Sequence, residues 1–240
     1  MRRPRVPGNR IPLAPGGSLV VARFSVAETW LDQGDGTPDR RRMLVHAAAC
    51  YLLFIATWVP LNEYSVGRDA ATLYLPGESS LPFVPEFEYL YALGYVLPVI
   101  ALLGIPTVRG AVRVFIAFLL TLTVAYATYL IFPVYLERPE LRVDSVATFL
   151  LSLEYKDPSY NHFPSLHVAF VWLGYFAARR GLRRPALYAV FALGVTVSTM
   201  LVKQHYFLDL VAGFGLAWIS WIIAGRLEGS SNVTNGERHR

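Results

Sequence analysis

The chain has 240 residues, of which 54% are hydrophobic, 14% are aromatic and 16% are charged. Soluble domains carry about a quarter of their residues as charges, whereas here the mean hydropathy is +0.40. These values exclude a water-soluble globular enzyme and a disordered chain. The net charge of +5 is typical of a nucleic-acid binder only where a basic face lies on a water-exposed fold. A single cysteine, Cys50, excludes a disulfide framework.

Six segments are apolar enough to form membrane helices. Crossing hydrocarbon about 30 Å thick takes roughly 20 apolar residues, because a helix advances about 1.5 Å per residue. We therefore predict an all-α, multi-pass integral membrane protein with six transmembrane helices. The predicted spans are 43–61, 88–105, 111–132, 166–178, 185–202 and 206–224, of which the fourth is short.

The positive residues predict the orientation of these spans. Seventeen of the 22 Lys and Arg residues lie in the two tails and in the connections after the second and fourth spans. Cytoplasmic segments are rich in such residues, so both termini are predicted to be cytoplasmic. The basic charge is then an orientation signal that excludes nucleic acid as a partner. The use of 20 Arg against 2 Lys is typical of a GC-rich bacterial genome, which favours a bacterial cell membrane.

Three regions follow from this pattern. Residues 1–42 are predicted to be a flexible basic tail with an interfacial helix near 20–31, residues 43–226 the transmembrane domain, and residues 227–240 a disordered tail. The segments 62–87 and 133–164 face outward. In the second of these, aromatic residues predict an interfacial lid, namely Tyr155, Tyr160 and Phe163.

The chemistry is expected in three polar clusters, all on the outward side, because ionisable groups at membrane depth are costly. The first is Arg138-Pro139, which follows the third span. An arginine here can snorkel to the lipid headgroups, or it can clamp an anion through its planar fork of donors. The second interpretation makes Arg138 a phosphate-binding residue.

The second cluster runs from Asn161 to His167 at the entry to the fourth span. A helix start presents unpaired N–H groups and a positive dipole end, which favour an anion. Ser165 can add a hydroxyl donor, and His167 lies one turn inside as either a structural histidine or a proton donor. His162 is interpreted as an interfacial residue.

The third cluster, Lys203 to Asp209, opens the sixth span. His205 and Asp209 are four residues apart, so they share a helix face. The carboxylate can accept a hydrogen bond from one ring nitrogen of the histidine and so fix its tautomer. The other nitrogen is then free to act as a nucleophile. Together the clusters supply what phosphoryl transfer needs: cations, an oriented nucleophile and a proton donor.

The three motifs resemble those of the type 2 phosphatidic acid phosphatase superfamily. Pro164-Ser165-Leu166-His167 is similar to the second motif of that family, His205 and Asp209 keep the spacing of its third, and Arg138-Pro139 resembles the end of its first. The resemblance implies that His205 forms a phosphohistidine, Asp209 orients it, His167 acts as acid and base, and Arg138 with Ser165 binds phosphate. No metal or other cofactor is implied.

The sequence departs from the family at two cations, because Ile131 and Thr199 stand where Lys and Arg belong. Lys203 is the first candidate to replace them, with Arg142 and Lys156 as others. Leu166 and the run after His205 look more like the branch of inositol phosphorylceramide synthase and sphingomyelin synthase, which transfer a phospho-headgroup to a lipid alcohol.

We therefore predict a membrane lipid phosphatase with its site on the extracytoplasmic side, acting on a membrane lipid phosphate or phospholipid. The alternative is a phosphotransferase with a lipid alcohol as acceptor. A third hypothesis, a non-catalytic haem or metal protein using His167 and His205 as ligands, is disfavoured because Asp209 and the nearby arginine favour an anion.

Overall fold

The computed structural model describes residues 27–236, and within that range it is all helical, without strands. Five of the helices are α2 (Arg40–Ser65), α3 (Glu88–Leu103), α4 (Val108–Ile131), α6 (Leu166–Ala178) and α7 (Pro185–Leu201). Further helical elements are α5 (Val146–Glu154), α8 (Phe207–Gly236) and two short 3-10 turns at Glu78–Ser80 and Pro85–Phe87.

Four of these helices are long and apolar enough to cross a membrane: α2, α3 with the preceding turn, α4 and α8 up to Glu228. These four indicate a multi-pass membrane protein. The helices α6 and α7 are also apolar but shorter. The 13 residues of α6 rise only about 20 Å, less than the roughly 30 Å of hydrocarbon.

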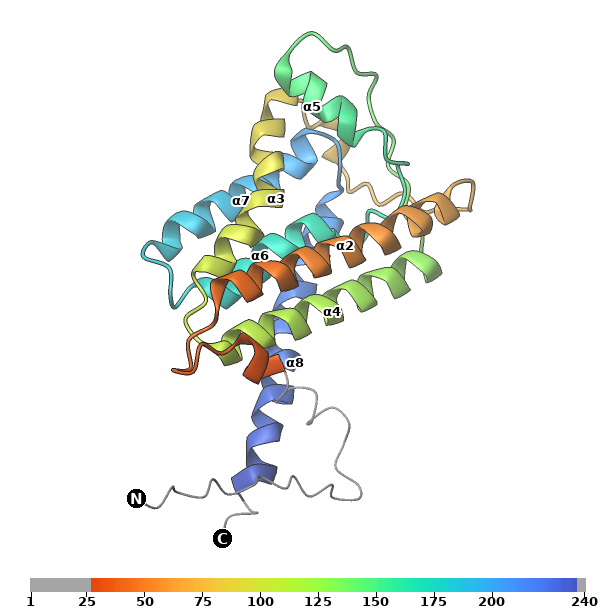
Figure 1. Cartoon of the computed structure of the whole chain (residues 1–240). Coiled ribbons are helices and arrows are strands. Elements are labelled where there is room, and N and C mark those ends of the chain that lie inside the picture. Colours follow the sequence, from red (N-terminus) through yellow and green to blue (C-terminus); the bar gives the residue numbers. More distant parts are fainter. Residues whose placement is uncertain (1–26, 237–240) are drawn as a thin grey trace, which may run out of the picture.

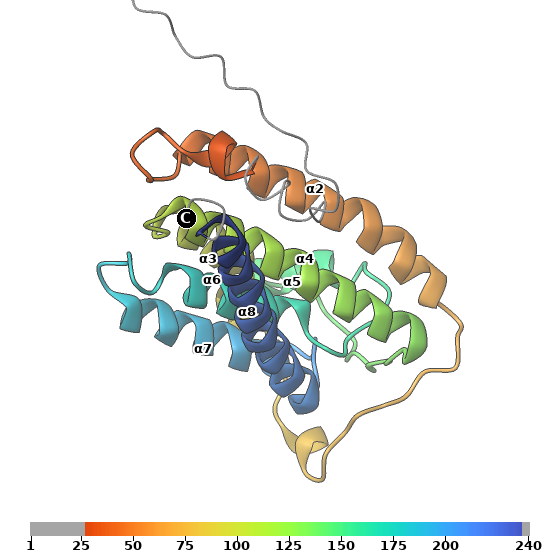
Figure 2. The ribbon, with the colours of Figure 1, turned by 90° about the horizontal axis from the view of Figure 1, so that it is seen from below.

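The short helix α6 lies at the centre of the bundle. It packs against α3, α4, α7 and α8, and most of its residues are buried. Figure 1 shows α5 at the upper end of the molecule, whereas the start of α2 and the far end of α8 lie at the lower end. Seen from below in Figure 2, α2 lies at one edge beside α4 and α7 lies at the opposite edge.

The ends of the predicted regions differ from the structure. Asp39 caps α2 through bonds from the backbone N–H groups of Arg41 and Arg42, so the helix begins three residues before the predicted span. Residues 27–31 are helical, and Leu31 is fully buried in the core. Residues 1–26 lie outside the described residues.

The helix α8 continues to Gly236, ten residues into the segment that the sequence predicts to be a disordered tail. Extending a helix that is already formed costs little, since each added residue makes one hydrogen bond, and an apolar pattern therefore marks the span and not the helix end. Residues 237–240 lie outside the described residues.

Two glycines of α8 make a matched pair for testing how tightly this helix packs. A Cβ on Gly213 would lie 2.4 Å from the carbonyl oxygen of Ser165, whereas nothing lies within 4 Å of a Cβ on Gly215. We expect Gly213→Ala to destabilise the protein by about 1–3 kcal/mol through overpacking. Gly215→Ala is expected to be neutral or stabilising by up to about 1 kcal/mol. Thermal unfolding of the purified variants measures both, and equal melting temperatures would contradict the close packing.

Candidate active site

The pair His205 and Asp209 forms at the junction of α7 and α8. Asp209 is fully buried in the first turn of α8, and its Oδ2 lies 3.1 Å from His205 Nδ1. The same oxygen accepts a 2.9 Å bond from the N–H of Tyr206. A carboxylate can only accept, so the His205 proton is on Nδ1 and the lone pair is on Nε2. His205 itself lies two residues before the helix, not on its face as predicted.

A tight turn places His205 there. The backbone N–H groups of Gln204 and His205 both donate to the carbonyl of Thr199, at 2.9 and 3.1 Å. Lys203 takes up the left-handed conformation with φ of 54°, which is uncommon for a residue other than glycine. Its Nζ donates to the carbonyl of Leu81 at 2.8 Å. Lys203 is therefore directed toward the segment before α3.

Arg138 lies opposite this turn and is held by three groups. Its Nη1 donates to the carbonyl of Asp157 at 2.6 Å, its Nη2 donates to Gln204 Oε1 at 2.7 Å, and the guanidinium stacks 4.9 Å from the ring of Tyr155. Its buried Nε has no hydrogen-bond partner among the described residues. A buried donor without a partner is costly, and this nitrogen is closed to a ligand as the side chain stands, so Arg138 bears on a phosphate through its charge at the cavity wall.

Ser165 is the N-cap of α6. It is fully buried, its Oγ accepts from the N–H of Val168, and its own N–H donates to the carbonyl of Asp209. The residue therefore joins the start of α6 to the first turn of α8. Through that bond it helps to fix the place of Asp209.

His167 lies in the first turn of α6 and faces α3. Its ring stacks on Tyr91, with 4.1 Å between the ring centroids, and Tyr95 packs against it edge-on. Its Nε2 is 3.0 Å from the carbonyl oxygen of Tyr91. Because a carbonyl only accepts, Nε2 carries the proton and Nδ1 is the nitrogen that can exchange one. Gly94 provides the room for this ring, since a Cβ there would lie 1.9 Å from His167 Nε2.

One cavity of about 570 Å³ connects these groups. His205, His167 and Arg138 all line it. Asp209, Ser165 and Lys203 are not among the residues that line it. Asp209 and Ser165 lie behind the cavity wall, where Asp209 contacts His205 and the N–H of Ser165 donates to the Asp209 carbonyl. Lys203 is directed toward Leu81.

Two lining residues were missed by the sequence analysis. His162 was interpreted as interfacial, but it is buried and its ring centroid lies 5.4 Å from that of His205. Burial lowers the pKa of His162 well below its ordinary value, and His205 and Arg138 lower it further, so its ring is neutral. Gln204 is also buried and holds Arg138. The sequence signal that could have found both residues is their position in the chain, since His162 lies three residues before Ser165 and Gln204 directly precedes His205.

A carboxylate also reaches the cavity. Glu154, at the end of α5, accepts a 2.8 Å hydrogen bond from the hydroxyl of Tyr95. Burial raises the pKa of Glu154, and the bond from Tyr95 opposes that shift. Among residues 27–236 no group of three or more His, Cys, Asp or Glu side chains is placed to hold a metal ion.

Comparison with known protein families gives one match. Residues 114–230, just under half of the chain, match the model of the PAP2 superfamily. No curated protein and no solved structure matches the chain. The matched range contains every site residue from Arg138 to Asp209, so the likeness to the PAP2 superfamily extends over the polar end of the cavity.

Proposed function

We propose that this protein is an integral membrane phosphatase that hydrolyses a lipid phosphate ester through a phosphohistidine on His205. The observation that carries the proposal is that His205, oriented by a buried aspartate, shares one cavity with His167 and Arg138. The family match independently favours phosphate esters as substrates.

The geometry supports a two-step mechanism. In the first step His167 starts with a proton on both ring nitrogens. The Nε2 lone pair of His205 attacks phosphorus, the bond to the lipid oxygen breaks, and that oxygen takes the Nδ1 proton of His167, which becomes neutral. Asp209 stabilises the charge that develops on His205 through the bond to Nδ1. In the second step His167 takes a proton from water, the water oxygen attacks phosphorus, and the bond to His205 breaks. Arg138, at the cavity wall, stabilises the negative charge of the phosphoryl oxygens in both steps.

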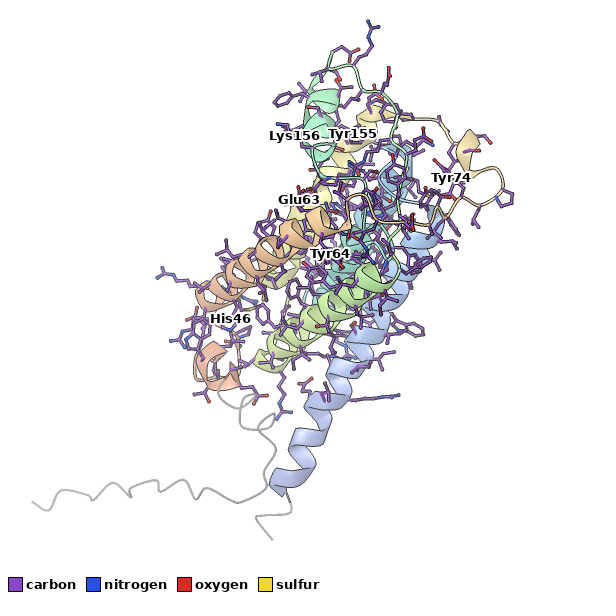
Figure 3. All side chains as sticks on the ribbon, turned by 90° about the vertical axis from the view of Figure 1, so that its right-hand side faces the viewer. His46, Glu63, Tyr64, Tyr74, Tyr155 and Lys156 are labelled. Atoms are coloured by element: carbon purple, nitrogen blue, oxygen red, sulfur yellow. The ribbon has the colours of Figure 1, made fainter. Side chains whose placement is uncertain are left out.

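The placement of the site supports an extracytoplasmic location. The site lies at the start of α8, whereas the start of α2 and the far end of α8 lie together at the other end of the bundle (Figure 1). Figure 3 likewise shows Tyr155 and Lys156, beside the site, at the end opposite His46. If the arginine-rich tails are cytoplasmic, as the positive-inside rule predicts, then the end of the cavity that contains His205 and Arg138 lies on the extracytoplasmic side of the membrane. Six membrane spans fit this arrangement if α6 and α7 cross the bilayer inside the bundle.

A second candidate function is transfer of a phospho-headgroup to a lipid alcohol. The observation that favours it is the shortage of positive charge, since Ile131 is 83% exposed on the bundle surface and Lys203 bonds Leu81. Arg138 is then the one Arg or Lys side chain among the described residues that line the cavity. One cation suits a phosphodiester, with one negative charge, better than a phosphomonoester with two.

A trapping experiment tests the covalent intermediate. Purified protein is mixed with lipid phosphate carrying labelled phosphorus, quenched within one turnover, and digested for mass spectrometry. We expect the label on His205. No label, or a label on another residue, contradicts the proposal. Adding diacylglycerol to the labelled enzyme separates the two functions, because hydrolysis releases phosphate and transfer gives labelled lipid.

A further inference from the structure

The cavity continues far from the histidines. The helix α4 contributes Tyr129 near the histidines and, 11 to 15 positions earlier in the chain, Phe118, Phe115 and Val114. These 15 positions correspond to about 22 Å along a helix axis, which is most of the roughly 30 Å of hydrocarbon in a bilayer. On α6 the lining likewise runs from His167 to Ala177.

The two ends of the cavity differ in polarity. The polar groups that bear on phosphate chemistry gather at the head, around Arg138 and His205. The far end carries no charged side chain among its described lining residues and includes Ile105, Phe115 and Ala177. The shape and the polarity gradient match an amphiphile with an anionic head and one long apolar tail.

Helix α2 closes this cavity on one side. It is held at its ends, where Met43 is buried in the core and Ser65 Oγ donates to Asn161 Oδ1 at 2.9 Å, and in its middle, where the Tyr126 hydroxyl of α4 donates to the Phe54 carbonyl. No residue in the apolar stretch of α2 that could cross a membrane is fully buried. Residues Ala47, Cys50 and Phe54, spaced three and four apart on one helix face, line the cavity. Figure 2 shows α2 at the edge of the bundle.

We infer that a hydrocarbon tail of the substrate lies in this cavity, between α2 and the helices α3, α4 and α6, while its phosphate lies at His205. The inference rests on the proposed function, from which it takes the phosphate. The occupant is a tail of the substrate itself because the apolar end and the phosphate end belong to one continuous space. An empty or water-filled apolar cavity of this length would be unfavourable, and a tail removes that cost.

Cys50 reports on this space directly. It is the single cysteine of the chain and it lines the cavity, so N-ethylmaleimide labels one position. We expect dioleoyl phosphatidic acid to slow the labelling of Cys50 by at least about threefold at saturation, as occupancy of a site requires. Dioctanoyl phosphatidic acid, whose tails are too short to reach Cys50, is expected to slow it little.

Equal protection by dioleoylglycerol would show that any bilayer lipid enters and would overturn the assignment to the substrate, as would no protection at all. The labelling needs no turnover. Protection of Cys50 without any release of phosphate would therefore contradict the proposed function and leave the tail site standing, so the two failures are distinguishable.

A second measurement uses chain-length dependence. Cys50→Trp fills the cavity, and Leu52→Trp, at a side chain 68% exposed on α2, is the matched control. We expect Cys50→Trp to lower kcat/KM for the dioleoyl substrate by about tenfold, the factor for roughly two methylene groups that lose their burial. The value for the dioctanoyl substrate is expected to stay within about twofold. Equal losses for both substrates in Cys50→Trp would overturn the inference.

Discussion

Replacing His205 by alanine is expected to lower kcat/KM for a lipid phosphate by at least about 10⁴-fold, because it removes the nucleophile that forms the covalent intermediate. The fold is expected to survive, since the His205 ring lies at the cavity surface and the turn is held by backbone bonds to Thr199. Release of phosphate by the purified variant measures the loss, and a melting temperature near that of the parent shows that the bundle is intact.

Two further variants test whether the loss reflects this position. His46→Ala is the matched control, because His46 packs against Trp30 and Phe115 and is not among the residues that line the cavity. It is expected to keep nearly full activity. Asp209→Asn, which keeps the shape but not the charge, is expected to lose about 10²- to 10⁴-fold, as the wrong tautomer is then favoured. Substantial turnover by His205→Ala would end the phosphohistidine mechanism.

The helices were predictable where hydrophobic length was the signal, and their ends were not. Each of the four long apolar helices overlaps one predicted span and extends beyond it at one end or both, because an apolar run of this length has few alternatives to a helix. The helix α5 was missed inside the predicted outward loop. It has nine residues and depends on a capping box between Ser145 and Thr148, which is too local a signal to register in a search for spans.

The site was predictable where residue spacing decides contact. Asp209 lies four residues after His205, and that separation brings the two side chains together in the turn as it would on a helix. Lys203 was not predictable, because its side-chain direction follows from a left-handed backbone conformation. Arg138 meets Gln204 across 66 residues, and no local pattern encodes such a contact.

The position of His167 gives a second large effect, produced by one methyl group outside the three motifs. Gly94→Ala would place a Cβ 1.9 Å from His167 Nε2, and contacts under 3.0 Å are essentially never seen. The ring must leave the carbonyl of Tyr91, so His167 Nδ1 no longer reaches the leaving oxygen. We expect kcat to fall by at least about 10²-fold, because a proton donor displaced by about 1 Å can lower the rate by that factor.

A double-mutant cycle separates this effect from general damage to the bundle. If Gly94→Ala acts through His167, it should add little further loss to a His167→Ala variant, whose small side chain also relieves the clash. Gly194→Ala in α7 is the control for adding a methyl group between helices, because its nearest neighbour, Leu90, lies at 3.7 Å. A loss of the same factor in both backgrounds would mean that Gly94 serves helix packing and that the proton donor must be sought elsewhere in the cavity.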